Sequence, residues 1–427
     1  MKIEELYNLY LQHPSIHTDT RKLKAGDIFF ALKGPNFNGN EFAGQALEKG
    51  ASFVIMDDAL PFENERIIPV QDSLEYLQKL ARYHRTQFKD RVPFIAITGS
   101  NGKTTTKELV HSVLSAQFIT YTTEGNLNNH IGIPLTLLKI KRDAQMAVIE
   151  MGANHVKEIE GYCGYVIPTH GLITNIGKAH LEGFGGIEGI RKGKGELFDH
   201  LRRVGGVAFV NADDGLLMEM SKGIVISAYG INNGMIQGQP IEGHSFLSLT
   251  LKGEKEIKIT TRLVGDYNLY NVLAAVTIGK YFGMEDDKIR VAIENYVPSN
   301  SRSQMIKKNS NTIVLDAYNA NPGSMRAAIE NFAKMDAANK ILLLGGMMEL
   351  GKDSEKEHRE IIRLIDQFTW NNVVLVGSDF KDISPAYIHF DTSDEAANWV
   401  LHQHFQNSTM LIKGSRSTQM ERVLESV

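Results

Sequence analysis

Residues 98–105, with the sequence TGSNGKTT, carry groups suited to binding a nucleotide phosphate. They directly follow an apolar run at 94–97, which predicts a buried strand, a tight glycine turn and a helix. The glycines let backbone N–H groups approach the phosphates, and the helix N-terminus adds positive potential. Lys103 supplies a positive charge, and Thr104 a hydroxyl for Mg²⁺. The expected nucleotide-binding residues here are Gly99, Ser100, Asn101, Gly102, Lys103, Thr104 and Thr105.

The loop differs from the common GxxxxGK[ST] pattern, because Ile97 stands where that pattern requires glycine. It has the shorter form TGSxGKTT, which points away from general ATPases and GTPases. The alternative interpretation is a glycine turn followed by a surface lysine. The strand before the loop, the helix after it and the pair of threonines argue against that alternative.

Length, charge and cysteine count limit the class of protein to which this chain can belong. A chain of 427 residues suggests about three domains. With 46 basic and 50 acidic residues the formal charge is -4, so we expect no nucleic-acid partner and no anionic-lipid surface. The single cysteine, Cys163, excludes an intrachain disulfide and a cysteine zinc site, and it is expected to be a buried apolar residue of a cytoplasmic protein. We predict no signal peptide and no membrane insertion.

The chain divides into three blocks, and we predict an α/β fold for each. Residues 1–85 form a small first domain with strand-like runs at 27–32 and 52–56. Residues 86–297 form a central P-loop-type domain in which apolar runs alternate with helical patterns such as 103–115, which implies a mostly parallel sheet. Residues 298–427 alternate again, as a Rossmann-like domain with strands at 312–315, 341–344, 373–376 and 410–412.

Polar residues follow the predicted central strands, where parallel sheets place their ligands. Glu150 ends the strand 146–149, and from position alone it fits either a Mg²⁺ ligand or a solvated strand-end acid. His180 follows the strand 171–174 and by itself is a weak signal. The amides that could bind a polar substrate, or simply form a turn, are Asn126, Asn128 and Asn129.

These segments together resemble the Mur ligases of peptidoglycan synthesis, and the resemblance runs almost end to end. The loop at 98–105 is typical of the whole superfamily. The segments AYNANP at 317–322 and KGSR at 413–416 point to the member that adds D-alanyl-D-alanine. The other matching segments are DIFFALKG at 27–34, GNLNN at 125–129, EMGAN at 150–154, AHLEGFG at 179–185 and KGELF at 194–198.

The resemblance implies an ATP-dependent amide ligase with a UDP-sugar domain, an ATPase domain and an amino-substrate domain. Lys103 then holds the β- and γ-phosphates, while Thr104 and Glu150 coordinate a first Mg²⁺ and His180 reaches a second. Lys194 matches a family lysine that is often carbamylated. A carbamate would turn this cation into an oxygen-donor anion suited to a hard metal ion. The alternative is that Lys194 is an ordinary solvated helix lysine.

Further roles follow from the resemblance alone. The nucleotide is expected to meet Asn271, Arg302 and Asp316. The amino substrate and the acyl-transfer region are expected to meet Asn319, Asn321, Lys413, Ser415 and Arg416, since arginine suits a carboxylate. The uridine-nucleotide face is expected to include Asp19, Thr20, Arg21, Phe37, Asn38 and Gly39. Ordinary alternatives for that face are turn chemistry at Asn38-Gly39 and a surface salt bridge at Arg21.

Four positions depart from the family pattern. Tyr267 and Asn40 each replace a common histidine, Gly346 stands where aspartate is common, and Lys157 where glycine is usual. None removes an expected metal or phosphate ligand.

The implied substrates are UDP-N-acetylmuramoyl-tripeptide and D-alanyl-D-alanine, joined through an acyl phosphate by a monomeric enzyme. One alternative is another ligase on the same scaffold, such as an earlier Mur ligase or a folylpolyglutamate synthase. A second is a catalytically silent nucleotide-binding module. The AYNANP and KGSR segments argue against the first, and the set Lys103, Thr104, Glu150, His180 and Lys194 argues against the second.

Overall fold

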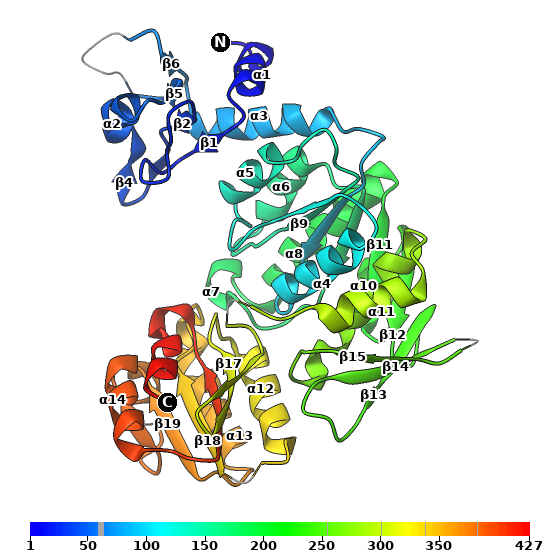
Figure 1. Ribbon diagram of the computed structural model, residues 1–427, viewed down its shortest axis with the longest axis vertical. Helices are drawn as coiled ribbons and strands as arrows, with labels where there is room; N and C mark the ends of the chain where they lie inside the picture. The colour runs from blue at the N-terminus through cyan, green and yellow to red at the C-terminus, as the bar shows by residue number, and fades with distance from the viewer. Residues whose placement is uncertain (59–63, 254, 300, 338, 382) are drawn as a thin grey trace.

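Three α/β units follow one another along the long axis of the molecule, from the N-terminal unit to the C-terminal unit (Figure 1). The computed structural model describes residues 1–58, 64–253, 255–299, 301–337, 339–381 and 383–427. Each unit is built around its own largely parallel sheet, so the α/β prediction is confirmed. No helix of these described residues is both long and apolar enough to cross a bilayer.

The N-terminal unit has a four-stranded parallel sheet in the order β1-β2-β5-β6 and a small β3-β4 hairpin. Both apolar runs expected here form strands that are almost entirely buried. The elements are α1 (Ile3–Gln12), β1 (Ile16–His17), β2 (Ile28–Phe30), β3 (Lys33–Gly34), β4 (Phe37–Asn38), η1 (Gly39–Phe42), α2 (Ala43–Glu48), β5 (Phe53–Met56), β6 (Ile67–Pro69) and α3 (Ser73–Thr86).

The central unit has a nine-stranded sheet in the order β15-β14-β13-β12-β11-β10-β7-β9-β8, in which only the pairings of β14 are antiparallel. The elements are β7 (Phe94–Thr98), α4 (Lys103–Ser115), β8 (Thr120–Thr122), α5 (Gly132–Leu138), β9 (Met146–Glu150), α6 (Glu158–Val166), β10 (His170–Ile173), α7 (Leu181–Phe184), α8 (Ile187–Val204), β11 (Val207–Asn211), α9 (Gly215–Met220), β12 (Val225–Gly230), β13 (Ile236–Ile241), β14 (Ser248–Lys252), β15 (Ile257–Thr260), η2 (Asp266–Asn268), α10 (Leu269–Tyr281) and α11 (Asp286–Asn295).

The helix that follows the phosphate loop is held by packing on two sides. Leu109, Val113 and their neighbours on α4 are fully buried against the sheet and against α10. Nearly every residue of α10 is buried, as expected for a helix that is apolar all round. Gly279 permits the close approach, because a Cβ there would lie 2.8 Å from Val113 Cγ1. This packing fixes the first turn of α4, and with it the loop.

The C-terminal unit has a six-stranded sheet in the order β16-β17-β21-β18-β19-β20, parallel except for β16. All four apolar runs expected here form strands. The elements are β16 (Gln304–Lys308), β17 (Asn311–Asp316), α12 (Pro322–Lys334), β18 (Asn339–Gly345), η3 (Gly351–Asp353), α13 (Ser354–Ile365), β19 (Asn372–Val376), η4 (Ser378–Phe380), β20 (Ile388–Phe390), α14 (Ser393–Gln403), β21 (Ser408–Lys413), η5 (Arg416–Thr418) and η6 (Met420–Ser426).

Helix α3 joins the N-terminal unit to the central unit, where it packs on α5 and α6 (Figure 1). The buried ring of His84 on α3 ties three segments together. Its Nδ1 lies 3.1 Å from the Tyr7 hydroxyl on α1, and its Nε2 lies 2.8 Å from the Ile140 carbonyl oxygen. Burial lowers the pKa of His84, which favours the neutral ring.

Candidate functional site

The phosphate loop has the backbone that its glycines predict. Gly99 and Gly102 have φ values of +139° and +79°, which side-chain-bearing residues rarely adopt. A Cβ on Gly102 would lie 2.7 Å from Asn271 Oδ1, and one on Gly99 would collide with Thr174. The loop is therefore shaped by neighbours that leave no room for side chains, and Asn271 supports it from α10.

The segment after β10 clamps the same loop. Asn175 Oδ1 accepts a hydrogen bond from the Asn101 N–H at 3.0 Å, and Thr174 donates to the Asn101 carbonyl at 2.6 Å. Ser100 exchanges hydrogen bonds of 2.9 Å with the backbone of Gly177. These contacts hold the loop N–H groups in place before a ligand arrives, which reduces the ordering cost of binding.

Lys103 begins α4, and its ammonium donates to the carbonyls of Gly99 at 2.8 Å and Ser100 at 3.1 Å. Desolvation lowers its pKa, although Glu150 opposes this shift. A bound phosphate would supply a negatively charged partner for this ammonium.

Glu150 ends β9 as a buried carboxylate directly opposite Thr104. Its Oε1 accepts from the Thr104 hydroxyl at 3.1 Å and from Asn128 Nδ2 at 2.7 Å. Its Oε2 is buried and has no hydrogen-bond partner among the described residues. An unsatisfied carboxylate oxygen beside a hydroxyl and a phosphate loop fits a magnesium ion. No three His, Cys, Asp or Glu side chains in the described part of the chain gather as a metal cluster. Other oxygen ligands, such as phosphate, would therefore have to complete the coordination.

Lys194 on α8 is almost completely buried, which excludes the solvated helix lysine as an interpretation. Its ammonium donates to the Ala153 carbonyl at 2.9 Å and lies 5.0 Å above the Phe184 ring. Burial lowers its pKa well below the ordinary value, and the charge of Lys103 acts in the same direction. Nearby Glu196 is occupied elsewhere, because it accepts from the N–H groups of Lys157 and Glu160.

His180 precedes α7 in a left-handed conformation, with φ of +56°. Its Nδ1 pairs with the carboxylate of Glu349, which belongs to the C-terminal unit. A second ion pair joins the two units nearby, between Lys178 and the buried Glu357 at 2.6 Å. His180 therefore lies where the two units meet.

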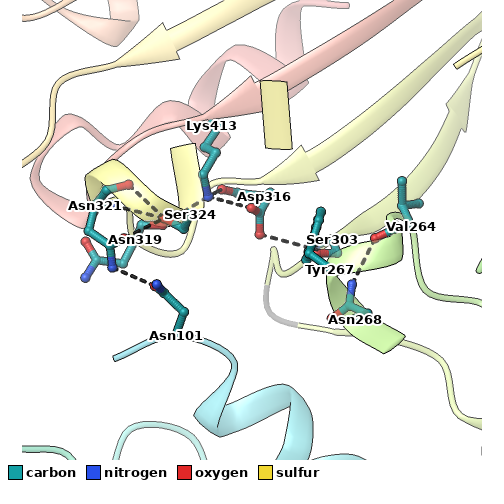
Figure 2. A network of polar contacts seen from close by, with 10 residues as sticks. All are labelled: Asn101, Val264, Tyr267, Asn268, Ser303, Asp316, Asn319, Asn321, Ser324 and Lys413. Atoms are coloured by element: carbon teal, nitrogen blue, oxygen red, sulfur yellow. Dashed lines mark hydrogen bonds and ion pairs between the residues drawn. The ribbon is translucent and has the colours of Figure 1, made fainter. Parts of the chain in front are cut away.

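Figure 2 shows the polar network that the C-terminal unit brings to the site. Lys413, at the end of β21, is buried and pairs with Asp316, at the end of β17, at 2.5 Å. Asp316 also accepts from the Ser303 N–H at 3.1 Å, and the Ser303 hydroxyl lies 2.8 Å from that of Tyr267. Burial raises the pKa of Tyr267, and the charge of Asp316 adds to the shift.

Asn321 links this network to the phosphate loop, since its Nδ2 donates to Asn101 Oδ1 at 2.6 Å (Figure 2). Asn321 also caps α12 and accepts from the Ser324 N–H at 3.0 Å. The cap places the N-terminus of a helix of the C-terminal unit against the loop of the central unit. An anion bound between the phosphate loop and Asn321 would meet the N-termini of both α4 and α12.

Tyr318 contacts two arginines at the same edge. The Arg302 guanidinium is 3.7 Å from the centre of its ring, and that of Arg416 is 5.5 Å away. Arg416 also donates to the Tyr318 hydroxyl at 3.4 Å. The ring therefore holds two cations in place by cation–π attraction.

These groups surround one cleft of about 590 Å³ between the central and C-terminal units. The expected site residues along it are Ser100, Asn101, Gly102, Lys103, Thr104, Thr105, Asn128, Asn129, Glu150, His180, Asn271, Arg302, Asp316, Asn319, Asn321 and Lys413. In the central and C-terminal units, the expected residues that do not line it are Gly99, Asn126, Lys194, Ser415 and Arg416. Asn129 accepts from the N–H groups of Ile131 and Gly132, so its side chain acts in a turn.

The residues expected to face uridine lie in the N-terminal unit. Arg21 is exposed and pairs with Asp19 at 2.8 Å, and Thr20 donates to Gln45 Oε1 at 2.6 Å. Asn38 accepts from the N–H of Asn40, as a turn asparagine does. A Cβ on Gly39 would lie 2.5 Å from the Leu32 carbonyl oxygen, and the Phe37 ring is largely exposed beside this turn.

Comparison with known proteins identifies the family. Three family models match: "Mur ligase family, catalytic domain" at residues 14–85, "Mur ligase middle domain" at 97–279 and "Mur ligase, glutamate ligase domain" at 301–416. A UDP-N-acetylmuramoyl-tripeptide–D-alanyl-D-alanine ligase of Bacillus subtilis (strain 168) is 33% identical, over 96% of this chain and 92% of that protein. The chain belongs to the Mur ligase family.

Solved structures agree with this assignment. The crystal structure of MurF from Acinetobacter baumannii has a TM-score of 0.88 at 33% identity, covering 96% of this chain and 92% of that one. MurF ligase from Thermotoga maritima in complex with ADP also has a TM-score of 0.88, at 26% identity and 97% coverage of both chains. Folylpolyglutamate synthase from Mycobacterium tuberculosis, at 15% identity and a TM-score of 0.63, covers 82% of this chain and 94% of that one and shares the fold alone.

The structure gives local reasons for three of the four departures from the Mur ligase pattern, those at Tyr267, Asn40 and Gly346. Tyr267 reaches Ser303, as described above. Asn40 exchanges hydrogen bonds with Asp57. A Cβ on Gly346 would lie 2.9 Å from Asp379 Oδ2, so an aspartate there would bring two carboxylates together. Lys157 has φ of +74°, a conformation that favours the usual glycine.

Sequence reasoning missed several residues of this Mur ligase site. Tyr267 was noted only as a departure, and Asn175, Ser303, Tyr318 and Glu349 were not singled out. Tyr318 lies inside the AYNANP segment, and Asn175 follows a predicted strand, so motif and position were available signals. Glu349 has no such local signal, because its role depends on a contact with His180 across two units.

Proposed function

We propose that this chain joins D-alanyl-D-alanine to UDP-N-acetylmuramoyl-tripeptide, with conversion of ATP to ADP and phosphate. The observation that carries the proposal is one cleft with the phosphate loop on one wall and, on the other, residues of the AYNANP segment together with Lys413, the first residue of KGSR. Relatives that bear the name of this ligase match the chain over nearly its whole length. We further propose a monomeric cytoplasmic enzyme.

The reaction proceeds in two steps. A carboxylate oxygen of the tripeptide attacks the γ-phosphorus of ATP, and the bond to ADP breaks, which leaves an acyl phosphate. The dipeptide amine then attacks the acyl carbon, inorganic phosphate leaves and the amine nitrogen loses a proton. Lys103 and the loop N–H groups stabilise the charge on the transferring phosphoryl group.

Thr104 and Glu150 would hold a first Mg²⁺, and His180 a second. A divalent ion supplies charge neutralisation for phosphoryl transfer when bound. Gly99, Ser100, Asn101, Gly102, Lys103, Thr104 and Thr105 would bind the phosphates, and Asn271, Arg302 and Asp316 the rest of the nucleotide.

The two remaining substrates have separate places. The donor's uridine part would bind in the N-terminal unit, residues 1–85, through the face that includes Phe37 and Arg21. Its peptide end would extend into the central unit, residues 86–297, toward Asn126 and Asn128. In the C-terminal unit, residues 298–427, the dipeptide would bind near Lys413 and Arg416, and the other residues expected there are Asn319, Asn321 and Ser415.

The test is a screen of donors and amine acceptors with ADP release as the signal. We expect ADP release only when UDP-N-acetylmuramoyl-tripeptide and D-alanyl-D-alanine are both present. Equal activity with L-alanine, glutamate and the D-dipeptide would contradict the substrate assignment. Lys103→Ala should lower turnover by at least about 100-fold, because one charge on the transferring group contributes several kcal/mol. The variant should retain the wild-type melting temperature.

We also propose that Lys194 is carbamylated in the active enzyme. Burial lowers its pKa, which favours the neutral amine. That nitrogen attacks the carbon of CO₂, forms an N–C bond and releases a proton. The product is an anionic oxygen donor beside Ala153 and Phe184.

Labelled bicarbonate tests this modification without using activity. A ¹³C carbamate signal is expected in the wild type and is expected to disappear in Lys194→Ala. Lys192→Ala is the matched control, because Lys192 lies on the same helix but is exposed, and it should keep the signal. A fully active, substrate-bound enzyme with an unmodified Lys194 would refute the proposal.

A further inference from the structure

Glu349 occupies an unusual position at the carboxyl edge of the C-terminal sheet. It follows β18, whose neighbour β21 ends at Lys413, and the Ser415 N–H donates to the Gly346 carbonyl at 3.1 Å. Its own φ is +63°, a left-handed conformation that costs free energy for a residue other than glycine. Backbone strain of this kind is concentrated at functional sites.

The side chain of Glu349 leaves its own unit and reaches the central one. Its carboxylate pairs with His180 Nδ1, and its carbonyl oxygen lies 3.4 Å from the Glu182 N–H. The side chain is still 47% exposed, so a ligand can reach it. A carboxylate of the C-terminal unit therefore lies beside His180, a residue that lines the cleft.

Charge complementarity indicates what this carboxylate binds. A dipeptide has a carboxylate at one end, suited to Lys413 or Arg416, and an amine at the other. Two other acids at this edge are already occupied: Asp316 by Lys413 and Ser303, and Asp379 by the Ser354 hydroxyl at 3.0 Å. Among the described residues, the one side chain that pairs with Glu349 is that of His180, which belongs to the central unit.

We propose that Glu349 binds the attacking amine of D-alanyl-D-alanine and holds it toward the acyl phosphate. This inference rests on the function proposed above. In the substrate complex the amine N–H groups donate to the Glu349 carboxylate, in place of the contact with His180. The nucleophile is thereby held beside His180, which lines the same cleft as Lys103, and proximity of this kind accelerates the second step. Glu349 is thus a substrate-binding residue of the amine subsite.

Glu349→Gln tests the proposal, because it keeps the size of the side chain and removes the charge. The KM for the dipeptide should rise by roughly 10-fold or more, as expected for loss of a charged hydrogen bond. The KM values for ATP and for the UDP-tripeptide should not change. The acyl phosphate, trapped by hydroxylamine as a hydroxamate without dipeptide, should form at the wild-type rate. Glu182→Gln, an acid that touches the same segment through its backbone, should behave as wild type.

Three results would overturn the inference. A wild-type KM for the dipeptide in Glu349→Gln would show that the charge does not bind the amine. Slower hydroxamate formation with an unchanged dipeptide KM would assign Glu349 to phosphoryl transfer or to the metal. A lower melting temperature with all three KM values raised together would show a structural role. Absence of dipeptide-dependent ADP release in the wild type is a separate outcome, which would refute the proposed function itself.

Discussion

Lys157 adopts a backbone conformation that suits glycine better than lysine. Its φ is +74°, immediately before α6, and its N–H donates to Glu196 Oε1 at 2.6 Å. A left-handed residue with a Cβ costs about 1–2 kcal/mol. Its side chain offers little compensation, since the ion pair with Glu160 is exposed to solvent, and water screens such pairs.

Lys157→Gly is therefore expected to stabilise the protein. The release of strain, about 1–2 kcal/mol, exceeds the extra chain entropy of glycine, about 0.5–1 kcal/mol, by roughly 0.5 kcal/mol or slightly more. For a domain of roughly 150–250 residues, such as the central unit, this gain in the free energy of unfolding corresponds to a rise of about 1–2 °C in melting temperature. Lys157→Ala is the control, because it removes the ion pair but keeps the Cβ. A glycine variant no more stable than the alanine variant would contradict the strain argument.

Single residues were predictable where the local sequence determines their place. Lys103 and Thr104 follow directly from the loop pattern. The position of Glu150 at a strand end left two interpretations open, and its expected role came from the Mur ligase resemblance. The contact of Tyr267 with Ser303 joins residues 36 positions apart, and that of Glu349 with His180 joins two sheets. A single sequence gives the order of elements but not which distant side chains meet, so these contacts required the structure.

At the scale of elements, the strands that were predicted are the buried ones. Strands β7, β9 and β18 lie inside parallel sheets, and their continuous apolar runs reflect burial on both faces. Strands β13, β14 and β15 at the edge of the central sheet were not predicted. Most of their residues are partly or fully exposed, as in the run Ile236–Ile241, so they lack the apolar run that identifies a strand.

We expect His84, at the contact of α1 with α3, to make the stability of the protein depend on pH. Burial lowers the pKa of His84, so the folded protein binds this proton less well than the unfolded chain does. Stability should therefore fall as pH decreases below about 6.5, the ordinary histidine value, until the folded protein also becomes protonated. The loss is at most about 1.4 kcal/mol for each unit by which the two pKa values differ.

Thermal unfolding between pH 7.5 and 5.5 checks this expectation. His84→Gln removes the titrating ring, so its melting temperature should fall less over this range than that of the wild type. Tyr7→Phe is the control, since it removes only the hydroxyl partner of His84 and should keep the wild-type slope. If the melting temperatures of the wild type and His84→Gln fall equally over this pH range, the pH dependence arises from groups other than His84.

At the scale of the whole molecule, the cleft exists because two sheets turn their carboxyl edges toward each other. Three contacts between the central and C-terminal units beside it are polar: Asn101 with Asn321, His180 with Glu349 and Lys178 with Glu357. Interfaces of this kind permit domain movement. Such movement suits an acyl phosphate, which must be protected from water until the amine arrives.

The pair of Lys178 and Glu357 provides a test of that closure. Glu357 is buried, and its Oε1 lies 2.6 Å from Lys178 Nζ. Lys178→Gln leaves this carboxylate buried and unpaired, which is strongly unfavourable in the closed arrangement. The variant should therefore open, with a larger radius of gyration in solution X-ray scattering. It should also release more ADP than it forms amide, because water reaches the acyl phosphate.

The double variant Lys178→Gln, Glu357→Gln distinguishes two possible causes of opening. One is the lost attraction between the two side chains, and the other is the unpaired buried charge of Glu357. The double variant removes the buried charge as well as its partner, so its radius of gyration and its ratio of ADP to amide should return toward the wild-type values. If the single variant matches the wild type in both measurements, the ion pair does not hold the units together. If the single and double variants open equally, the attraction between the two charges matters, and the desolvated carboxylate adds nothing beyond it.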